Sequence, residues 1–501
     1  MGSALSDEVT PHEVTQASTE PSVKKVYSGA TPPEVTPAAI SAVLRRAVND
    51  GFLPSVDSTG GLLQKPVALI YDLDAWEENL KICAKAFGPG CLNAIAVKSN
   101  PLASMLKRAL ALGFGAECAS IGEVLHAQAV GFPAERIVFD APCKTRAEMT
   151  WALRHGIPLN IDNFDELERI AALHAELPQI PGAVIGLRIN PLVGAGEIAA
   201  LSVSTNDSKF GISSSHANEI IAAYERYQWL NCLHVHTGSG GMALQTLVGG
   251  VRKAVDLALL VNKTLGRQQI TVLDIGGGLP ANYASDAWGT EKVPTFEEYA
   301  EELRRELPGV LLGDDCDKGL FDKVITEFGQ SLNAKAGLLA SRVEYAKPTA
   351  DGDGQIAVVH FGADTCPRQC YTKDHSRRIE LYDGSTFAPK SGISVRQHIA
   401  GPLCFQGDML VKNFLSPKLS VDDFVVLRDT GANCLSLFSR HCSRQAPRAL
   451  GYRVRSIGER EIEVTELQEL KPAESFSSLC GFWGGDVPQQ LHRELAAVAS
   501  S

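Results

Sequence analysis

The sequence predicts an α/β protein in which a (β/α)8 barrel of the TIM type is followed by a mostly antiparallel β-sandwich or β-barrel domain. Two features of the pattern predict this class. From residue 67 to residue 345, short strands that are apolar on both faces alternate with helical segments, and about eight such units in ~250 residues favour a closed barrel. After residue 345, strands follow one another with turns between them and little helix, which is typical of an antiparallel domain.

The elements of both domains follow in order along the chain. Apolar runs predict barrel strands at 67–71, 94–97, 115–118, 136–139, 159–161, 183–189, 233–236, 272–275 and 323–326. Helical spacing of apolar side chains predicts helices over 72–87, 101–112, 121–130, 147–155 and 164–174. In the second domain, apolar runs predict strands at 356–361, 394–396, 424–427 and 451–454.

These elements divide the chain into four parts. Residues 1–36 are rich in Ser, Thr, Pro, Val and Glu and show no sustained apolar period, which is typical of a disordered leader. We expect 37–66 to be an N-terminal segment that joins the β domain. We expect 67–345 to form the barrel and 346–501 to form the C-terminal β domain.

Composition and charge restrict the function. The chain has 501 residues and a formal net charge of −11, which argues against a general nucleic-acid binder and against docking on anionic membranes. No uncharged apolar stretch reaches the ~18 residues that span a bilayer. The 12 cysteines are scattered and no secretory signal opens the sequence, so we expect a reducing compartment, the cytoplasm. Cys366 and Cys370 alone are a weak zinc signal, and no metal is predicted.

Polar residues and glycines follow several predicted strands at the end where such barrels carry their active sites. They are Lys98, Glu117, Arg188, His236, Gly276, Gly277, Gly278 and Glu327. Lys98 directly follows four apolar residues, so partial desolvation would lower its pKa and favour the neutral amine that forms an imine. The alternative is a solvated lysine at the barrel rim.

Glycine-rich corners follow two of the strands, at 236–241 and at 276–278. Backbone N–H groups in such loops can close around phosphate, although a single glycine run is more often just a tight loop. Two corners in one barrel favour phosphate. Glu327 would keep a pyridine nitrogen protonated, and its alternative role is a salt bridge to Arg188. An imine-forming lysine, a phosphate loop and this carboxylate together point to pyridoxal 5′-phosphate (PLP).

Six motifs, in order, resemble those of the fold type III PLP-dependent amino-acid decarboxylases. Diaminopimelate decarboxylases are the most similar and ornithine decarboxylases come next. The match runs from about Pro66 to Tyr452. The motifs are residues 96–100, 117–120 with Glu123, 187–191 with 208–212, 234–239, 274–278 and 401–404.

The resemblance implies a PLP-dependent carboxy-lyase that is a homodimer with shared active sites. Lys98 corresponds to the family's Schiff-base lysine, and His236 to the histidine that stacks on the pyridine ring. Cys404 lies in the loop that reaches into the neighbouring subunit, where it would protonate the carbanion left by CO₂. The residues placed at the cofactor are Lys98, Glu117, Arg188, His236, Ser239, Gly276, Gly277, Gly278, Glu327 and Asn433, the last where the family has a tyrosine.

The sequence departs from the family pattern where substrate and phosphate are held. Gln330 replaces an arginine, and Phe405 replaces an acid that contacts the distal amine of the substrate. Cys366 replaces a second arginine with Arg368 close by, whereas Arg444 is retained. We expect PLP chemistry on a substrate whose distal end is smaller or less charged than that of meso-diaminopimelate. The expected substrate-binding residues are Gln330, Arg368, Tyr371, Phe405 and Arg444.

Two other functions remain compatible with the sequence. The altered pocket favours a catalytically silent paralogue that acts by binding a partner, whereas the intact Lys98, His236 and triple glycine oppose it. A PLP-dependent racemase on the same scaffold would need a second acid–base group on the opposite face of the ring.

Overall fold

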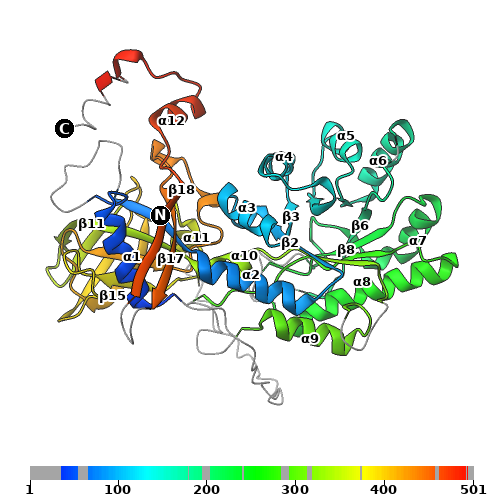
Figure 1. Cartoon of the computed structure of the whole chain (residues 1–501), viewed down its shortest axis with the longest axis horizontal. Helices are drawn as coiled ribbons and strands as arrows, with labels where there is room; N and C mark the ends of the chain where they lie inside the picture. The colour runs from blue at the N-terminus through cyan, green and yellow to red at the C-terminus, as the bar shows by residue number, and fades with distance from the viewer. Residues whose placement is uncertain are drawn as a thin grey trace, which may run out of the picture.

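The computed structural model describes residues 35–54, 66–178, 180–194, 204–239, 242–283, 293–312, 319–372, 375–456, 462–491 and 493–494. The expected leader therefore lies outside the described residues except for its last two positions. Figure 1 shows a barrel wrapped by helices on one side and a domain made mostly of sheet on the other. Helix α12 (Phe476–Phe482) lies at the top of that view, beyond the sheet domain.

Among the described residues, eight parallel strands close into a barrel, which confirms the predicted fold class. Hydrogen bonding runs in the order β5, β4, β3, β2, β10, β9, β8, β6, and β6 pairs with β5 to close the ring. The short β7 (Ile212–Ser213) pairs with the end of β6. The barrel strands are β2 (Cys91–Ala96), β3 (Gly115–Cys118), β4 (Ile137–Asp140), β5 (Leu159–Ile161), β6 (Ile185–Asn190), β8 (Cys232–Val235), β9 (Val272–Asp274) and β10 (Lys323–Thr326).

Helices surround the barrel because each has an apolar face that packs on the strands (Figure 1). Side-chain caps fix where several begin: Asp72 accepts from the Ala75 N–H, and Thr145 forms a capping box with Glu148. Left-handed glycines end α4 and α8. The helices are α2 (Leu73–Phe87), α3 (Ala103–Ala111), α4 (Ile121–Val130), α5 (Arg146–His155), α6 (Phe164–Glu176), α7 (Ala217–Arg226), α8 (Leu244–Leu265) and α9 (Phe296–Glu306).

The second domain is built on one branched sheet. Its order is β15, β14, β12, β11, β1, β17, β18, with β16 pairing with β11 and β13 pairing with β16. Most pairs are antiparallel, and the pairs β1–β17 and β12–β14 are parallel. The strands are β1 (Val67–Asp72), β11 (Gly337–Pro348), β12 (Gln355–Val359), β13 (Ile379–Tyr382), β14 (Ser394–Ala400), β15 (Met409–Pro417), β16 (Phe424–Arg428), β17 (Arg448–Ser456) and β18 (Ile462–Lys471).

The first strand expected for the barrel belongs to this second sheet instead. β1 pairs antiparallel with β11 and parallel with β17, so residues 67–72 leave the barrel, which begins with β2. All six residues of β1 are buried, and a central strand of either sheet would show that same apolar run. Helix α1 (Pro37–Asn49) packs on this sheet, where Ile40, Val43 and Leu44 share a core with Ile70 and Leu450.

The two domains are joined by hydrogen bonds around the residue that follows Lys98. Asn433 of the sheet domain donates its N–H to the Ser99 carbonyl at 2.9 Å. The Asn333 side chain donates to Ser99 Oγ at 2.8 Å and accepts from Trp76 Nε1–H at 2.8 Å. Residues of both domains thus fix the backbone next to the predicted lysine. Within the described ranges, no helix combines the length and apolarity needed to cross a membrane.

Candidate functional site

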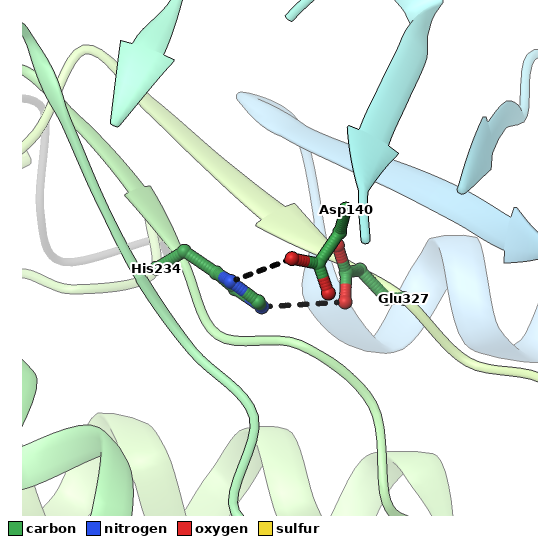
Figure 2. A group of neighbouring side chains, drawn as sticks. All are labelled: Asp140, His234 and Glu327. Atoms are coloured by element: carbon green, nitrogen blue, oxygen red, sulfur yellow. Dashed lines mark ion pairs between the residues drawn. The ribbon is translucent and has the colours of Figure 1, made fainter. Parts of the chain in front are cut away.

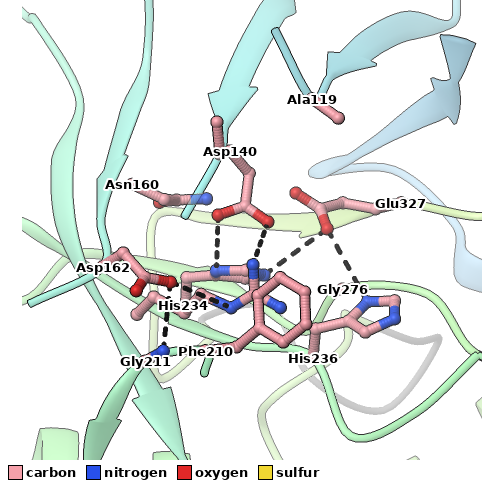
Figure 3. Close-up of polar contacts among 12 residues, drawn as sticks. Ala119, Asp140, Asn160, Asp162, Phe210, Gly211, His234, His236, Gly276 and Glu327 are labelled. Atoms are coloured by element: carbon pink, nitrogen blue, oxygen red, sulfur yellow. Dashed lines mark hydrogen bonds and ion pairs between the residues drawn. The ribbon is translucent and has the colours of Figure 1, made fainter. Parts of the chain in front are cut away.

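The predicted barrel residues lie in the carboxyl-terminal halves of their strands or just beyond them. Since all the barrel strands run in the same direction, these ends meet at one mouth. Figure 3 shows part of this group, with His236, Gly276 and Glu327 beside one another and Asp140 and His234 close by. Lys98, His236, Gly276–Gly278 and Glu327 follow β2, β8, β9 and β10, whereas Glu117 and Arg188 lie in the carboxyl-terminal halves of β3 and β6.

Lys98 is paired with a carboxylate from the next strand. Its Nζ lies 2.6 Å from both oxygens of Glu117, whose side chain is fully buried, while the lysine side chain is about half exposed. Desolvation lowers the pKa of Lys98, but the charges of Glu117 and Glu327 outweigh it and raise the pKa above its ordinary value. Burial raises the pKa of Glu117 to about 8 against the effect of the Lys98 charge. The sequence-based expectation that the Lys98 pKa is lowered is therefore wrong for the protein without cofactor, because the charges of the neighbouring carboxylates outweigh desolvation.

His236 is neutral, and its tautomer is set by the backbone. Burial and the charge of Arg188 lower its pKa to about 3. The Gly277 N–H donates to Nδ1 at 3.1 Å, so the ring proton sits on Nε2, which lies 3.2 Å from Ser239 Oγ. A neutral imidazole with both nitrogens bonded keeps its flat face available for an aromatic ring.

Arg188 forms its ion pairs away from Glu327. Its Nη1 lies 2.8 Å from Asp140 Oδ2, and its Nε lies 4.0 Å from Asp162 Oδ1. The guanidinium also lies over the Phe210 ring, 4.4 Å from the centroid. The alternative that made Glu327 the partner of Arg188 does not agree with this geometry, because Asp140 and Asp162 take that place.

Glu327 meets a histidine that the sequence analysis did not single out. His234 is fully buried, and its Nε2 lies 3.4 Å from Glu327 Oε2 while its Nδ1 lies 3.7 Å from Asp140 Oδ1 (Figure 2). Burial lowers the pKa of His234, but the charges of Asp140, Glu327 and Asp274 outweigh it and raise the pKa to about 9. Burial raises the pKa of Glu327, but the charge and contact of His234 outweigh it and lower the pKa below the ordinary value.

Asp140 could have been found by the rule that identified Lys98 and Glu327. It is the last residue of β4, and the predicted strand ended one residue earlier, at 139. Ligand atoms of Asp140, His234 and Glu327 lie within 4.8 Å of one another, which would also suit a metal ion. A protonated imidazole cannot ligate a metal, so the raised pKa of His234 favours a network of charges instead.

The glycine loop after β9 needs its glycines for close backbone contacts. Gly276 and Gly278 have positive φ angles of 66° and 101°. A Cβ at Gly277 would lie 2.3 Å from the Glu327 carbonyl oxygen, and one at Gly278 would lie 2.3 Å from the Gly238 carbonyl oxygen. Gly277 is therefore required by packing against β10 and not only by an approaching anion. The other predicted corner is described up to Ser239, and its Gly240 and Gly241 lie outside the described residues.

The predicted site residues of the sheet domain have contacts within that domain. Cys404 is exposed in the turn after β14. Phe405 stacks on Tyr371 of α11 (Pro367–Tyr371) with centroids 5.6 Å apart. Arg444 Nε lies 3.0 Å from Asp364 Oδ2, so this arginine already has a carboxylate partner. Among the described residues, no hydrogen bond, ion pair or ring contact joins Cys404 or Phe405 to the barrel mouth.

The two remaining substrate candidates lie nearer to the barrel. Gln330, the first residue of α10 (Gln330–Asn333), donates from Nε2 to the Ser239 carbonyl at 3.3 Å. The charge of Arg368 acts on Cys434, the residue after Asn433. Gln330 therefore bridges the ends of β10 and β8, and Arg368 lies toward the domain junction.

The residues of the mouth fit PLP. Glu327 Oε1 is buried without a hydrogen-bond partner, which is the unsatisfied acceptor that a pyridinium N–H requires. His236 is neutral and adjacent, and Lys98 supplies an amine. The Gly276 and Gly277 amides donate to Asp274 and His236, whereas within the described chain the Gly278 N–H has no acceptor and can serve an anion.

Comparison with known families agrees with this geometry. Residues 73–334 match the family described as "Pyridoxal-dependent decarboxylase, pyridoxal binding domain". The chain is 30% identical over 359 residues to diaminopimelate decarboxylase of Zymomonas mobilis, covering 70% of this chain and 78% of the relative. It is 28% identical over 374 residues to diaminopimelate decarboxylase of Archaeoglobus fulgidus, covering 74% of this chain and 83% of the relative.

Solved structures show the same architecture. Diaminopimelate decarboxylase from Helicobacter pylori, complexed with L-lysine, superposes with a TM-score of 0.69 at 25% identity, covering 84% of this chain and 97% of that one. A lysine/ornithine decarboxylase from Vibrio vulnificus, complexed with cadaverine, gives a TM-score of 0.64 at 20% identity, covering 82% and 96%. The second likeness concerns the fold alone.

Proposed function

Because the chain belongs to the fold type III pyridoxal-dependent decarboxylases and is a PLP-dependent carboxy-lyase, we propose that it decarboxylates an amino acid other than meso-diaminopimelate. One observation carries the catalytic part of the proposal: the unsatisfied Glu327 Oε1, the neutral His236 and the Lys98 amine lie at one barrel mouth. The substrate part of the proposal is supported by Gln330 and Phe405, which differ from the residues of the family pattern at these positions.

When bound, PLP supplies an electron-withdrawing ring that takes up the electron pair left by departing CO₂. The side chains of this chain hold and orient that ring. Lys98 would provide the amine that holds the cofactor, and Glu117 holds the Lys98 proton. Glu327 Oε1 would accept the ring N–H, and His236 would offer its face to the ring. The Gly278 N–H and the corner at Ser239 would hold the phosphate.

In this proposal Cys404 donates the final proton across a homodimer. It is exposed, and it lies in the sheet domain, apart from the barrel residues that it must join. Mixing Lys98→Ala chains with Cys404→Ala chains tests the shared site, because a mixed dimer regains one intact site. Random exchange should restore about a quarter of the wild-type activity. No recovery after verified subunit exchange contradicts a shared site.

The substrate is expected to lack a strongly basic distal group. Burying an ammonium without a carboxylate costs several kcal/mol, and a phenyl ring at position 405 returns only ~0.5–2 kcal/mol as a cation–π contact. Arg444 is already paired with Asp364, so it is less available to a distal carboxylate. We therefore expect meso-diaminopimelate to be a poor substrate.

The test is CO₂ release from a panel of L- and D-amino acids. Preferred turnover of meso-diaminopimelate contradicts the substrate proposal. Phe405→Glu should shift preference toward substrates with a distal amine, whereas Phe482→Glu, at an exposed phenylalanine of α12, should leave the profile unchanged. A PLP-loaded chain that releases no CO₂ from any substrate supports the silent paralogue. Exchange of the α-proton without CO₂ loss supports the racemase.

A further inference from the structure

A row of alternating charges links side chains from β6, β4 and β8 to Glu327, which follows β10. It runs from Arg188 through Asp140 and His234 to Glu327, with contacts of 2.8, 3.7 and 3.4 Å (Figures 2 and 3). The four side chains are 0–6% exposed. Arg188 uses Asp140 Oδ2 and His234 uses Oδ1, so one carboxylate serves both cations.

We propose that His234 is a positioning residue whose imidazolium keeps Glu327 ionised and aimed at the cofactor ring, with Asp140 holding the imidazolium from its other side. This inference rests on the proposed contact between Glu327 and the ring nitrogen. His234 touches neither cofactor nor substrate in this arrangement, and it acts through Glu327.

The placement of the ring between two carboxylates, 3.7 and 3.4 Å from its nitrogens, favours a doubly protonated ring. A neutral imidazole has one donor and one acceptor nitrogen, so in either tautomer a lone pair would face a carboxylate. In this structure Nδ1 faces Asp140 and Nε2 faces Glu327, and only the imidazolium offers a proton to both. The raised pKa of His234, about 9, agrees with this assignment.

The groups around Glu327 show why it needs this cation. Glu327 is buried beside Asp140, whose charge would raise the Glu327 pKa, and His236 is neutral. Asp274 of β9 also faces His234 and accepts from the Gly276 N–H and the Asn160 side chain. Arg188 of β6 is committed to Asp140 and Asp162. Without His234⁺, Glu327 would take up a proton and lose its ability to accept the ring N–H.

The experiment compares two ligands that differ only at the ring nitrogen. The full-length chain, freed of cofactor, is titrated with PLP and with its analogue in which C–H replaces the ring nitrogen. The wild-type chain should prefer PLP about tenfold to a hundredfold, the range for a hydrogen bond to a charged group. His234→Gln should reduce this ratio toward one, and Asp140→Asn should reduce it partly. His155→Gln, at an exposed histidine of α5, should leave the ratio unchanged.

Each outcome separates the two proposals. A wild-type chain with no preference for PLP contradicts the contact between Glu327 and the ring. A wild-type preference that survives in His234→Gln contradicts the positioning role, as does an equal loss of affinity for both ligands. If His234→Gln does not fold, Asp140→Asn decides: it should reduce the ratio partly, and an unchanged ratio overturns the inference.

A different observation carries a second inference. Cys366 and Cys434 are 68 positions apart in the sequence, yet their Sγ atoms lie 3.5 Å apart, and both residues are at most 1% exposed. Cys366 occupies the position where the sequence departs from the family arginine. The Cys366 thiol contact and the positive charge of Arg377 outweigh the effect of burial and lower the pKa of Cys434 to about 7, which favours the thiolate.

We propose that Cys366 and Cys434 form an oxidation site for small hydroperoxides. The Cys434 thiolate attacks the peroxide oxygen, which forms a sulfenic acid and releases water or an alcohol. The Cys366 thiol then attacks that sulfur, which releases water and leaves a disulfide, so the peroxide accepts two electrons. The sulfurs must approach from 3.5 Å to about 2.05 Å. Cys434 follows Asn433, whose N–H donates to the Ser99 carbonyl beside Lys98, so the pair lies one residue from a backbone contact of the cofactor residues.

The PLP-loaded protein is treated with hydrogen peroxide, denatured, alkylated and mapped by mass spectrometry. The expected product is a peptide pair that links Cys366 to Cys434, is 2 Da lighter than the two thiol peptides together and is reversed by dithiothreitol. Cys366→Ser should leave Cys434 at the sulfenic or higher oxidation level, whereas Cys143→Ser, at an exposed cysteine, should not affect the link. Oxidation of exposed cysteines without the 366–434 link overturns this inference.

Discussion

Replacing Glu117 with glutamine is predicted to speed the attachment of PLP to the cofactor-free chain, although it removes a carboxylate from the cofactor site. Attachment requires the neutral amine of Lys98, so its rate follows the neutral fraction of that amine. In the structure Nζ lies 2.6 Å from both Glu117 oxygens, and this pair keeps the amine protonated.

The size of the effect follows from the geometry of the pair. A hydrogen bond to a charged group contributes about 1.5–3 kcal/mol. Because the Lys98 side chain is 51% exposed, water screens the pair and the lower value applies. One pKa unit corresponds to about 1.4 kcal/mol, so the Lys98 pKa should fall by about one unit and the neutral fraction should rise about tenfold. The gain should appear above pH 8, where Glu117 is ionised.

The assay follows the absorbance change on mixing PLP with the cofactor-free chain between pH 8 and pH 10. Glu123→Gln is the matched control, because the Glu123 carboxylate accepts from the Ala119 N–H and not from Lys98. Borohydride reduction and peptide mapping must place the label on Lys98 in every variant. Superimposable pH–rate profiles for Glu117→Gln and the wild type would refute the argument.

Three further predictions concern stability. Gly277→Ala should destabilise the cofactor-free chain by about 1–3 kcal/mol in thermal unfolding, because the new Cβ would lie 2.3 Å from the Glu327 carbonyl oxygen. The control is Gly249→Ala, which should cause no such loss because the space around Gly249 is open. Asn333→Ala should lower the free energy of unfolding, measured with urea, by about 1–3 kcal/mol for each buried group that it leaves without a partner. These groups are the Trp76 indole N–H and the Ser99 hydroxyl. The folded-state pKa of His234 lies above its unfolded value, so its stabilisation is complete below pH 6.5 and is lost as the pH rises through about 9. His234→Gln should therefore lower the free energy of unfolding by up to about 3 kcal/mol at pH 6 and by much less at pH 10. An equal loss of unfolding free energy at both pH values contradicts this prediction.

Much of the fold could be predicted because its signals are local. The run at 115–118 and the helix over 121–130 coincide with β3 and α4, where burial on both faces and a Ser120 cap mark the boundaries. The strand-end rule also placed Lys98 and Glu327 at the barrel mouth. Their convergence follows from the common direction of the strands, which the alternation of strand and helix already implies.

The sequence by itself determined the barrel, the family and the cofactor, because buried strands, helix caps and motif spacings are properties of short segments. Only the tertiary structure decided that residues 67–72 join the second sheet, since an apolar run is the same in either sheet and the partner strand comes from over 250 residues away. Only the structure revealed the ion pair of Lys98 and the placement of His234 between Asp140 and Glu327. The pKa values of these groups depend on charges from different strands, which burial brings within a few ångströms and which low polarity couples strongly.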